Sequence, residues 1–174
     1  MKIPALFLLS LFTASFALAQ APKAPAKPKG PVVPADAEWH DVTKWGVEGR
    51  GWADQERKRW FDRMPAKAEG KVTPAVWNLS RDSSGMMVRF KSDATTISAR
   101  YTLLKASLGM PHMPATGVSG VDLYARDDEG NWRWVQVTKP AAQTVEATII
   151  TGLKPGSREY AAYLPLYNGV ESLE

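Results

Sequence analysis

MPHMPATGVSGVDLYARDDEGNWRWVQV, residues 110–137, is the stretch that decides the fold. Apolar and polar side chains alternate over residues 121–126, and a second alternating run covers residues 132–137. A period of two is typical of half-buried strands. The polar, glycine-containing segment 127–131 between the two runs has the length of a hairpin connection. We therefore predict an antiparallel hairpin with Trp132 and Trp134 on one face.

The rest of the folded chain has the same character. Residues 39–42 are expected to be extended, and short strand-like segments separated by turn residues then follow at 76–79, 86–91, 97–103, 145–151, 159–164 and 170–173. Many short strands without intervening helices indicate an all-β protein. The predicted fold is an antiparallel β-sandwich or jelly roll with one short helix. We expect that helix at residues 52–64, where large side chains recur at four-residue spacing before Pro65.

The first 35 residues differ from the rest. Lys2, an apolar run and the small-residue pattern Ala17-Leu18-Ala19 predict a signal peptide over residues 1–19, with an uncleaved membrane anchor as the alternative. Prolines recur at every third position of residues 20–35, which is typical of an extended polyproline linker. We therefore expect residues 36–174 to form the folded domain, exported to the periplasm or the extracellular space.

Charge and cysteine content exclude several kinds of site. The formal charge of +4 comes from lysines in the first 35 residues, which contain no acid, so the remainder of the chain is balanced. A nucleic-acid surface needs a local excess of cations and is not expected. The chain has no cysteine, so disulfides and lipid attachment through cysteine are excluded, and with only two histidines a zinc site is not expected. No cofactor is expected either.

The run Gly120-Val121-Asp122-Leu123-Tyr124 resembles the G-x-D-L-Y motif of the domain that precedes the catalytic domain in some secreted SGNH-type (GDSL-like) esterases. The sequences MPHMPATG at 110–117 and LPLYNGV at 164–170 fit the same family. The resemblance extends from Trp39 to the end of the chain. It implies a β-sandwich that lies N-terminal to an α/β hydrolytic domain, which would be this domain's partner.

The resemblance carries no catalytic residue onto this chain. The Gly-Asp-Ser block and the Asp-x-x-His block of an SGNH catalytic domain are both missing. Gly117-Val118-Ser119-Gly120 is not a nucleophile elbow, because it precedes a strand and Val121 stands where that motif has its last glycine. We expect these 174 residues to be a fragment of a longer esterase; the alternative is a short protein ending in an edge strand.

Two groups of residues are candidates for binding. His112 and Met113 lie in a loop fixed by Pro111 and Pro114, and with Tyr167 and Asn168 they are candidates for contact with the catalytic domain or its substrate cleft. The alternative is that this loop closes one end of the sandwich. Trp132 and Trp134 could stack on a sugar, but burial in the core is favoured because aromatic residues dominate sandwich cores. The acidic turn 127–131 lacks the ligand spacing of a calcium loop and is interpreted as a plain turn.

Three functions fit these observations. The first is a non-catalytic accessory domain of an exported SGNH-type esterase that acts on ester bonds, with acetyl esters of carbohydrates as the expected substrate. The second is a free-standing carbohydrate-binding module, and the third is a structural envelope protein without a ligand. The resemblance favours the first.

Overall fold

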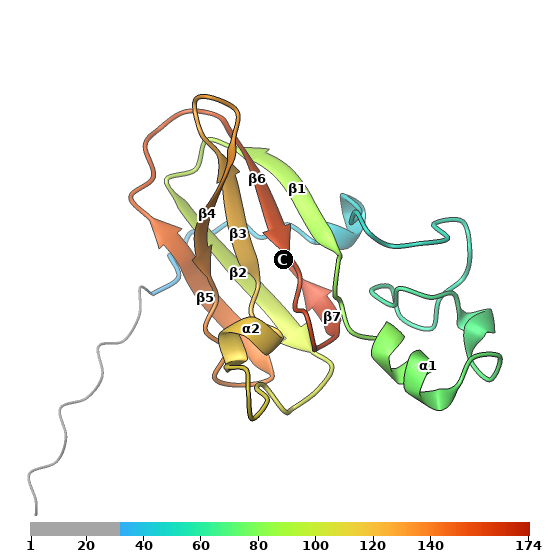
Figure 1. The fold of residues 1–174 in the computed structure, drawn as a ribbon. Coiled ribbons are helices and arrows are strands. Elements are labelled where there is room, and N and C mark those ends of the chain that lie inside the picture. Colours follow the sequence, from blue (N-terminus) through green and yellow to red (C-terminus); the bar gives the residue numbers. More distant parts are fainter. Residues whose placement is uncertain (1–31) are drawn as a thin grey trace, which may run out of the picture.

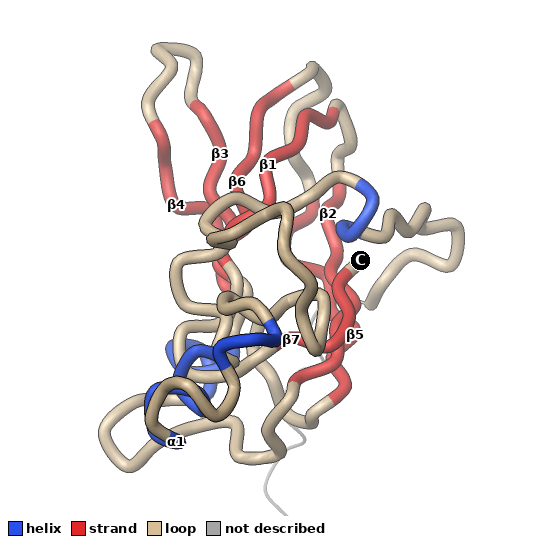
Figure 2. The backbone as a smooth tube through the Cα atoms, turned by 90° about the vertical axis from the view of Figure 1, so that its right-hand side faces the viewer, coloured by secondary structure: helices blue, strands red, loops and turns tan. Residues whose placement is uncertain are grey.

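Two antiparallel sheets make up the body of the protein, which a computed structural model describes over residues 32–174. The four-stranded sheet has the spatial order β1 (Met87–Ser92), β6 (Arg158–Tyr163), β3 (Asp122–Arg126) and β4 (Trp132–Val137). The three-stranded sheet has the order β5 (Thr144–Thr151), β2 (Thr96–Leu103) and β7 (Val170–Leu173). The two sheets form separate layers (Figures 1 and 2). The predicted all-β antiparallel sandwich is confirmed.

Alternating side chains from both sheets fill the space between the layers. Val88, Leu123 and Tyr160 enter it from the four-stranded sheet, and Tyr101 and Leu103 enter it from the three-stranded sheet. Each of these side chains is at most 2% exposed. Because successive side chains on a strand point to opposite faces, the residues between them are left on the outside of the sandwich.

The hairpin of β3 and β4 has the predicted position, but its tryptophans do not lie in the core. Arg126 pairs with Trp132 and Tyr124 pairs with Trp134 across the two strands. Since Leu123 points inward, these four residues lie on the outer face. Trp134 is 55% exposed and Trp132 is half-buried. The prediction that Trp132 and Trp134 are buried in the core is therefore wrong, and Val135 packs against the core instead.

The helices are not where the sequence was expected to place them. Residues 52–64 form turns, and Trp52 has a φ of +50°, which a helix does not allow. Residues 76–79, expected as a strand, lie in the helix α1 (Pro74–Ser80). Thr73 caps this helix by accepting a hydrogen bond from the Val76 amide, and Pro74 occupies its first turn. A second helix, α2 (Ala115–Ser119), immediately precedes the G-x-D-L-Y run.

Two single-turn 3-10 helices, Val42–Lys44 and Ala66–Ala68, complete the described helical segments. The extended lead-in expected at residues 39–42 contains no strand and passes into the first of them. The segment between this turn and β1, including α1, lies beside the sandwich (Figure 1). Arg59 attaches it there, because its guanidinium bonds both the fully buried Asp62 at 2.5 Å and Glu171 of β7 at 2.8 Å.

The predicted signal peptide and most of the predicted linker lie outside the described residues. Within residues 32–174, no helix has the length and apolar character needed to cross a bilayer.

Candidate functional site

Gly120 is required by the close approach of three chain segments. A β-carbon at this position would lie 2.3 Å from the Thr116 carbonyl oxygen and 3.0 Å from the Thr138 carbonyl oxygen. It would also meet the Val137 side chain at 2.7 Å. Contacts under 3.0 Å with backbone atoms leave no room for any other residue. Gly120 therefore lets the chain turn from α2 into β3 while it touches the segment after β4.

The other motif residues divide between the two faces of β3. Leu123 is fully buried in the core, whereas Asp122 and Tyr124 lie on the outer face. The Asp122 carboxylate accepts a hydrogen bond from the Trp134 indole nitrogen at 3.0 Å. The Tyr124 ring meets the Tyr163 ring edge-on, with 5.5 Å between centroids. The motif thus supplies one core anchor and two groups that organise aromatic rings on the outer face.

Tyr124, Trp132, Trp134 and Tyr163 form a surface that we call the aromatic face. Trp134 and Tyr163 are 55% and 41% exposed. Charged side chains lie among the rings: the Arg126 guanidinium stands 4.7 Å from the Trp132 ring centroid, and that of Arg89 stands 5.9 Å from it. The aromatic face thus combines exposed aromatic rings with charged, hydrogen-bonding side chains.

A buried polar network joins the G-x-D-L-Y run to the segment after β6. Asn168 is fully buried, and its amide nitrogen donates to the Lys105 carbonyl and the Ser119 hydroxyl, both at 3.1 Å. Its amide oxygen accepts from the Lys105 backbone nitrogen at 2.9 Å. The Ser119 hydroxyl in turn donates to the Leu108 carbonyl. Asn168 therefore fixes the arrangement of three segments that are far apart in the sequence.

Tyr101 closes the same network from β2. Its hydroxyl donates to the Ser119 carbonyl at 3.2 Å and lies 2.7 Å from the Thr138 hydroxyl, which also accepts from the Val121 amide. Burial raises the pKa of Tyr101 to about 12, although the bond with Thr138 opposes that change. The phenol is thus held in its neutral form.

This pKa gives a testable pH dependence. Because the folded-state pKa of Tyr101 lies above its ordinary value of 10.0, its contribution to stability is complete below about pH 10 and is lost as the pH rises toward about 12. We expect urea unfolding at increasing pH to show a loss of stability that is smaller in Tyr101→Phe. Ultraviolet titration should show a late-ionising phenol that Tyr101→Phe removes. A titration in which the wild type and this variant lose stability in parallel would contradict the assignment.

A comparison with known protein families matches residues 37–174 to GxDLY, described as the N-terminus of SGNH-hydrolase-type esterases. The chain belongs to this family. The matched region includes both sheets, the aromatic face and the buried network. No curated protein sequence matches the chain significantly.

A solved structure has the same fold. It is the crystal structure of a protein from Bacteroides ovatus ATCC 8483, described provisionally as a GDSL-like lipase. The TM-score is 0.69 at 23% identity, over 77% of the present chain and 38% of the other. The present chain thus spans little more than a third of that protein, and at this identity the likeness concerns the fold.

Two serine hydroxyls of this GxDLY domain, those of Ser119 and Ser80, are bonded to backbone carbonyls. The Ser119 hydroxyl is engaged with Leu108 inside the protein, and that of Ser80 donates to the Trp77 carbonyl. Both histidines, His40 and His112, are exposed, and within residues 32–174 neither hydrogen-bonds a serine. The same part of the chain holds no cluster of three or more potential metal ligands.

The loop residues singled out in the sequence have different environments. His112 is exposed, and Met113 is half-buried with its side chain against Gly117. Tyr167 is 40% exposed, and its amide donates to the Val118 carbonyl of α2 at 3.1 Å. Asn168, a candidate for contact with the catalytic domain or its substrate cleft, is instead fully buried. Its side chain has no exposed area to offer a partner.

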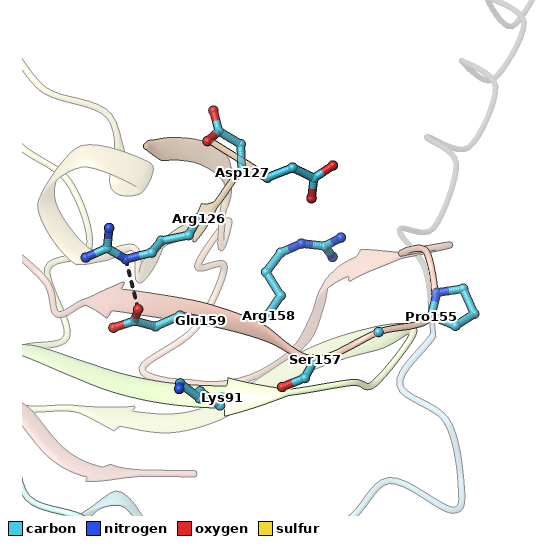
Figure 3. A pocket seen from close by; sticks show the side chains of 9 residues that line it. Lys91, Arg126, Asp127, Pro155, Ser157, Arg158 and Glu159 are labelled. Carbon is cyan, nitrogen blue, oxygen red and sulfur yellow. Dashed lines mark ion pairs between the residues drawn. The ribbon is translucent and has the colours of Figure 1, made fainter. Parts of the chain in front are cut away.

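A polar hollow of about 470 Å³ lies at the hairpin end of the four-stranded sheet (Figure 3). Arg126 and Glu159 form an ion pair at 2.8 Å on its wall. The complete lining is Lys91, Arg126, Asp127, Asp128, Pro155, Gly156, Ser157, Arg158 and Glu159. Three cationic and three anionic side chains are among these residues, so the hollow is charge-balanced.

Sequence reasoning did not identify Tyr163, Arg126 or Glu159 as site residues. Arg126 and Trp132 flank the predicted turn, and cross-strand partners share a face. The outward position of Arg126 would therefore have placed Trp132 outside. Tyr163 and Glu159 come from β6, whose pairing with β3 is not visible from local sequence.

Proposed function

We propose that this chain is a non-catalytic accessory domain of an exported SGNH-type esterase. The observation that carries the proposal is the family match over residues 37–174, in a domain whose described serines and histidines form no nucleophile–base pair. Export is supported by the signal-peptide pattern of residues 1–19. The domain would be connected to, and would support, a catalytic domain that performs the ester hydrolysis.

The end of the sandwich that carries α2 is the surface we propose for the catalytic domain. It presents Leu166 and Tyr167, which are 45% and 40% exposed, and the exposed His112. The network around Asn168 makes the supporting backbone rigid. A rigid surface loses little conformational entropy on association, so it suits a permanent contact or one wall of a substrate cleft.

Acetyl esters of carbohydrates are the substrate class we propose for the whole enzyme. The aromatic face supports this class, because exposed tryptophan and tyrosine rings offer stacking surfaces for sugar rings. An ester of a polymeric carbohydrate also leaves most of its chain outside the catalytic centre, where an accessory domain could hold it.

A serine-reactive fluorophosphonate probe tests the accessory role. We expect it to label a native polypeptide that contains residues 36–174, isolated from the organism that encodes it, and that polypeptide should release acetate from an acetylated polysaccharide. The purified 174-residue chain should remain unlabelled. Labelling or ester turnover by that chain would contradict the non-catalytic role. A native protein that neither carries nor binds a serine esterase would contradict the proposed partner.

A further inference from the structure

We propose that the aromatic face and the adjoining polar hollow together bind a neutral glycan chain. The inference rests on the proposed function, because it names the part of the protein that holds the carbohydrate. It is nevertheless a statement about binding by this chain alone, and it can be tested without any esterase activity.

The rings of the aromatic face are held in fixed orientations on the outer surface of a sheet. The bond from the Trp134 indole to Asp122 at 3.0 Å restrains that ring, although 55% of the residue is exposed. Tyr124 and Tyr163 support each other edge-to-face. A sugar ring has an apolar C–H face that packs against such rings, and little conformational freedom is lost because the rings are already ordered.

The polar hollow continues the aromatic face along the hairpin. Arg126 connects the two, since its guanidinium lies over the Trp132 ring at 4.7 Å from the centroid and its side chain lines the hollow. The Trp132 ring is itself covered, because the Arg126 guanidinium lies over it and Arg89 reaches toward it. A glycan would therefore stack on the exposed rings of Trp134 and Tyr163 and direct its next unit past Arg126 toward the hollow.

Charge favours a neutral ligand. The cations Lys91, Arg126 and Arg158 are matched in the hollow by Asp127, Asp128 and Glu159. Within the lining, Glu159 is already paired with Arg126 at 2.8 Å. A balanced wall of this kind offers donors and acceptors to hydroxyl groups but no net attraction to a polyanion or a polycation.

The same charges argue against a protein partner on this face. The centre of a protein interface is depleted of aspartate and glutamate, because burial removes their hydration, whereas arginine is enriched there. Here the carboxylates of Asp122 and Glu159 lie among the rings. A hydrated glycan leaves these groups in contact with water, whereas a packed domain would bury them.

Calorimetric titration with neutral soluble polysaccharides tests the inference. The protein expressed from all 174 residues is titrated with a xylan, a glucomannan and a β-glucan, with polygalacturonate as the charged comparison. We expect at least one neutral polymer to bind. Trp134→Ala and Tyr163→Ala should each weaken that binding about tenfold, as truncation of an interface anchor does. Trp52→Ala is the matched control, because Trp52 is 54% exposed but lies outside the aromatic face, and its affinity should not change.

Three results would overturn the inference: no binding of any neutral polysaccharide, binding of polygalacturonate alone, or equal affinities of the wild type, Trp134→Ala and Tyr163→Ala. Circular dichroism checks that both variants are folded. In the wild type, shifts of the indole N–H signals in NMR on addition of polysaccharide provide a second readout that needs no variant. If the native polypeptide hydrolyses esters while this chain binds no glycan, the proposed glycan site is wrong and the proposed accessory role is retained. If the chain binds glycan but no esterase accompanies it, the accessory role fails alone.

Discussion

Replacing Leu123 by alanine is expected to lower the free energy of unfolding by about 2–5 kcal/mol. Leu123 is fully buried and packs in the core between the two sheets. The change removes buried apolar surface and leaves an unfilled volume. Leu123 also lines a hollow of about 900 Å³, together with residues of the segment before β1 such as Trp39 and Trp45. The neighbouring side chains are held by the sheet backbone and can relax only in part, so the loss should be substantial.

Urea unfolding followed by tryptophan fluorescence measures this change. Leu79→Ala is the matched control, because it makes the same substitution at a residue of α1 that is 60% exposed. The control should change stability by less than about 0.5 kcal/mol. A Leu123→Ala variant as stable as Leu79→Ala would show that the leucine of the G-x-D-L-Y motif does not anchor the sandwich.

The strands of the sandwich could be predicted because one face of each is buried. Residues 97–103 illustrate this: Ala99, Tyr101 and Leu103 alternate with half-buried residues, and all three lie in the core. The same pattern located β1, β3 and β5 to within one residue at each end. Local alternation is sufficient for such strands, because a slip by one residue would expose every apolar side chain.

The segment before β1 could not be predicted in this way. Four-residue spacing over residues 52–64 suggested a helix, but the chain there is shaped by long side chains that bond backbone groups. Arg57 donates to the Asp62 carbonyl at 2.9 Å, and Arg50 donates to that of Trp60 at 2.8 Å. Such tertiary contacts override a local periodicity. The helix that does form was signalled by Thr73-Pro74, a cap followed by proline in the first turn.

The candidate site was visible only in part. Alternation correctly grouped Trp132 with Trp134 but did not say which face the pair occupied, since two valines compete for the core from the same strand. The core accepts Val135, and the indoles remain outside with Tyr124. The choice depends on pairing with β3, whose inward residues Leu123 and Ala125 already fix the faces. Residues from β6 enter the site through long-range pairing, which a single sequence does not reveal.

The network around Asn168 gives the other large expected effect. Asn168→Leu should lower the free energy of unfolding by about 2–5 kcal/mol, because it leaves the Lys105 amide, the Lys105 carbonyl and the Ser119 hydroxyl without the bonds that Asn168 now makes. Each buried polar group left unpaired costs about 1–3 kcal/mol, and the total is less than three such losses because the Ser119 hydroxyl keeps its bond to the Leu108 carbonyl. Leucine has the same number of side-chain heavy atoms, but its methyl groups are bulkier than the amide, so overpacking adds to the loss of hydrogen bonds.

Two measurements separate this effect from a general loss of stability. Asn78→Leu is the matched control at an exposed position of α1 and should be close to wild type in urea unfolding. Amide hydrogen exchange should show that Asn168→Leu removes protection from Lys105 while the amides of β3 remain protected. If Lys105 keeps its protection and the stability is unchanged, the Asn168 bonds contribute nothing, and the surface presented by His112 and Tyr167 must be held in place by the backbone alone. If the protection of Lys105 and the stability are lost together, the side chain of Asn168 is what couples Lys105 and the end of α2 to the segment before β7.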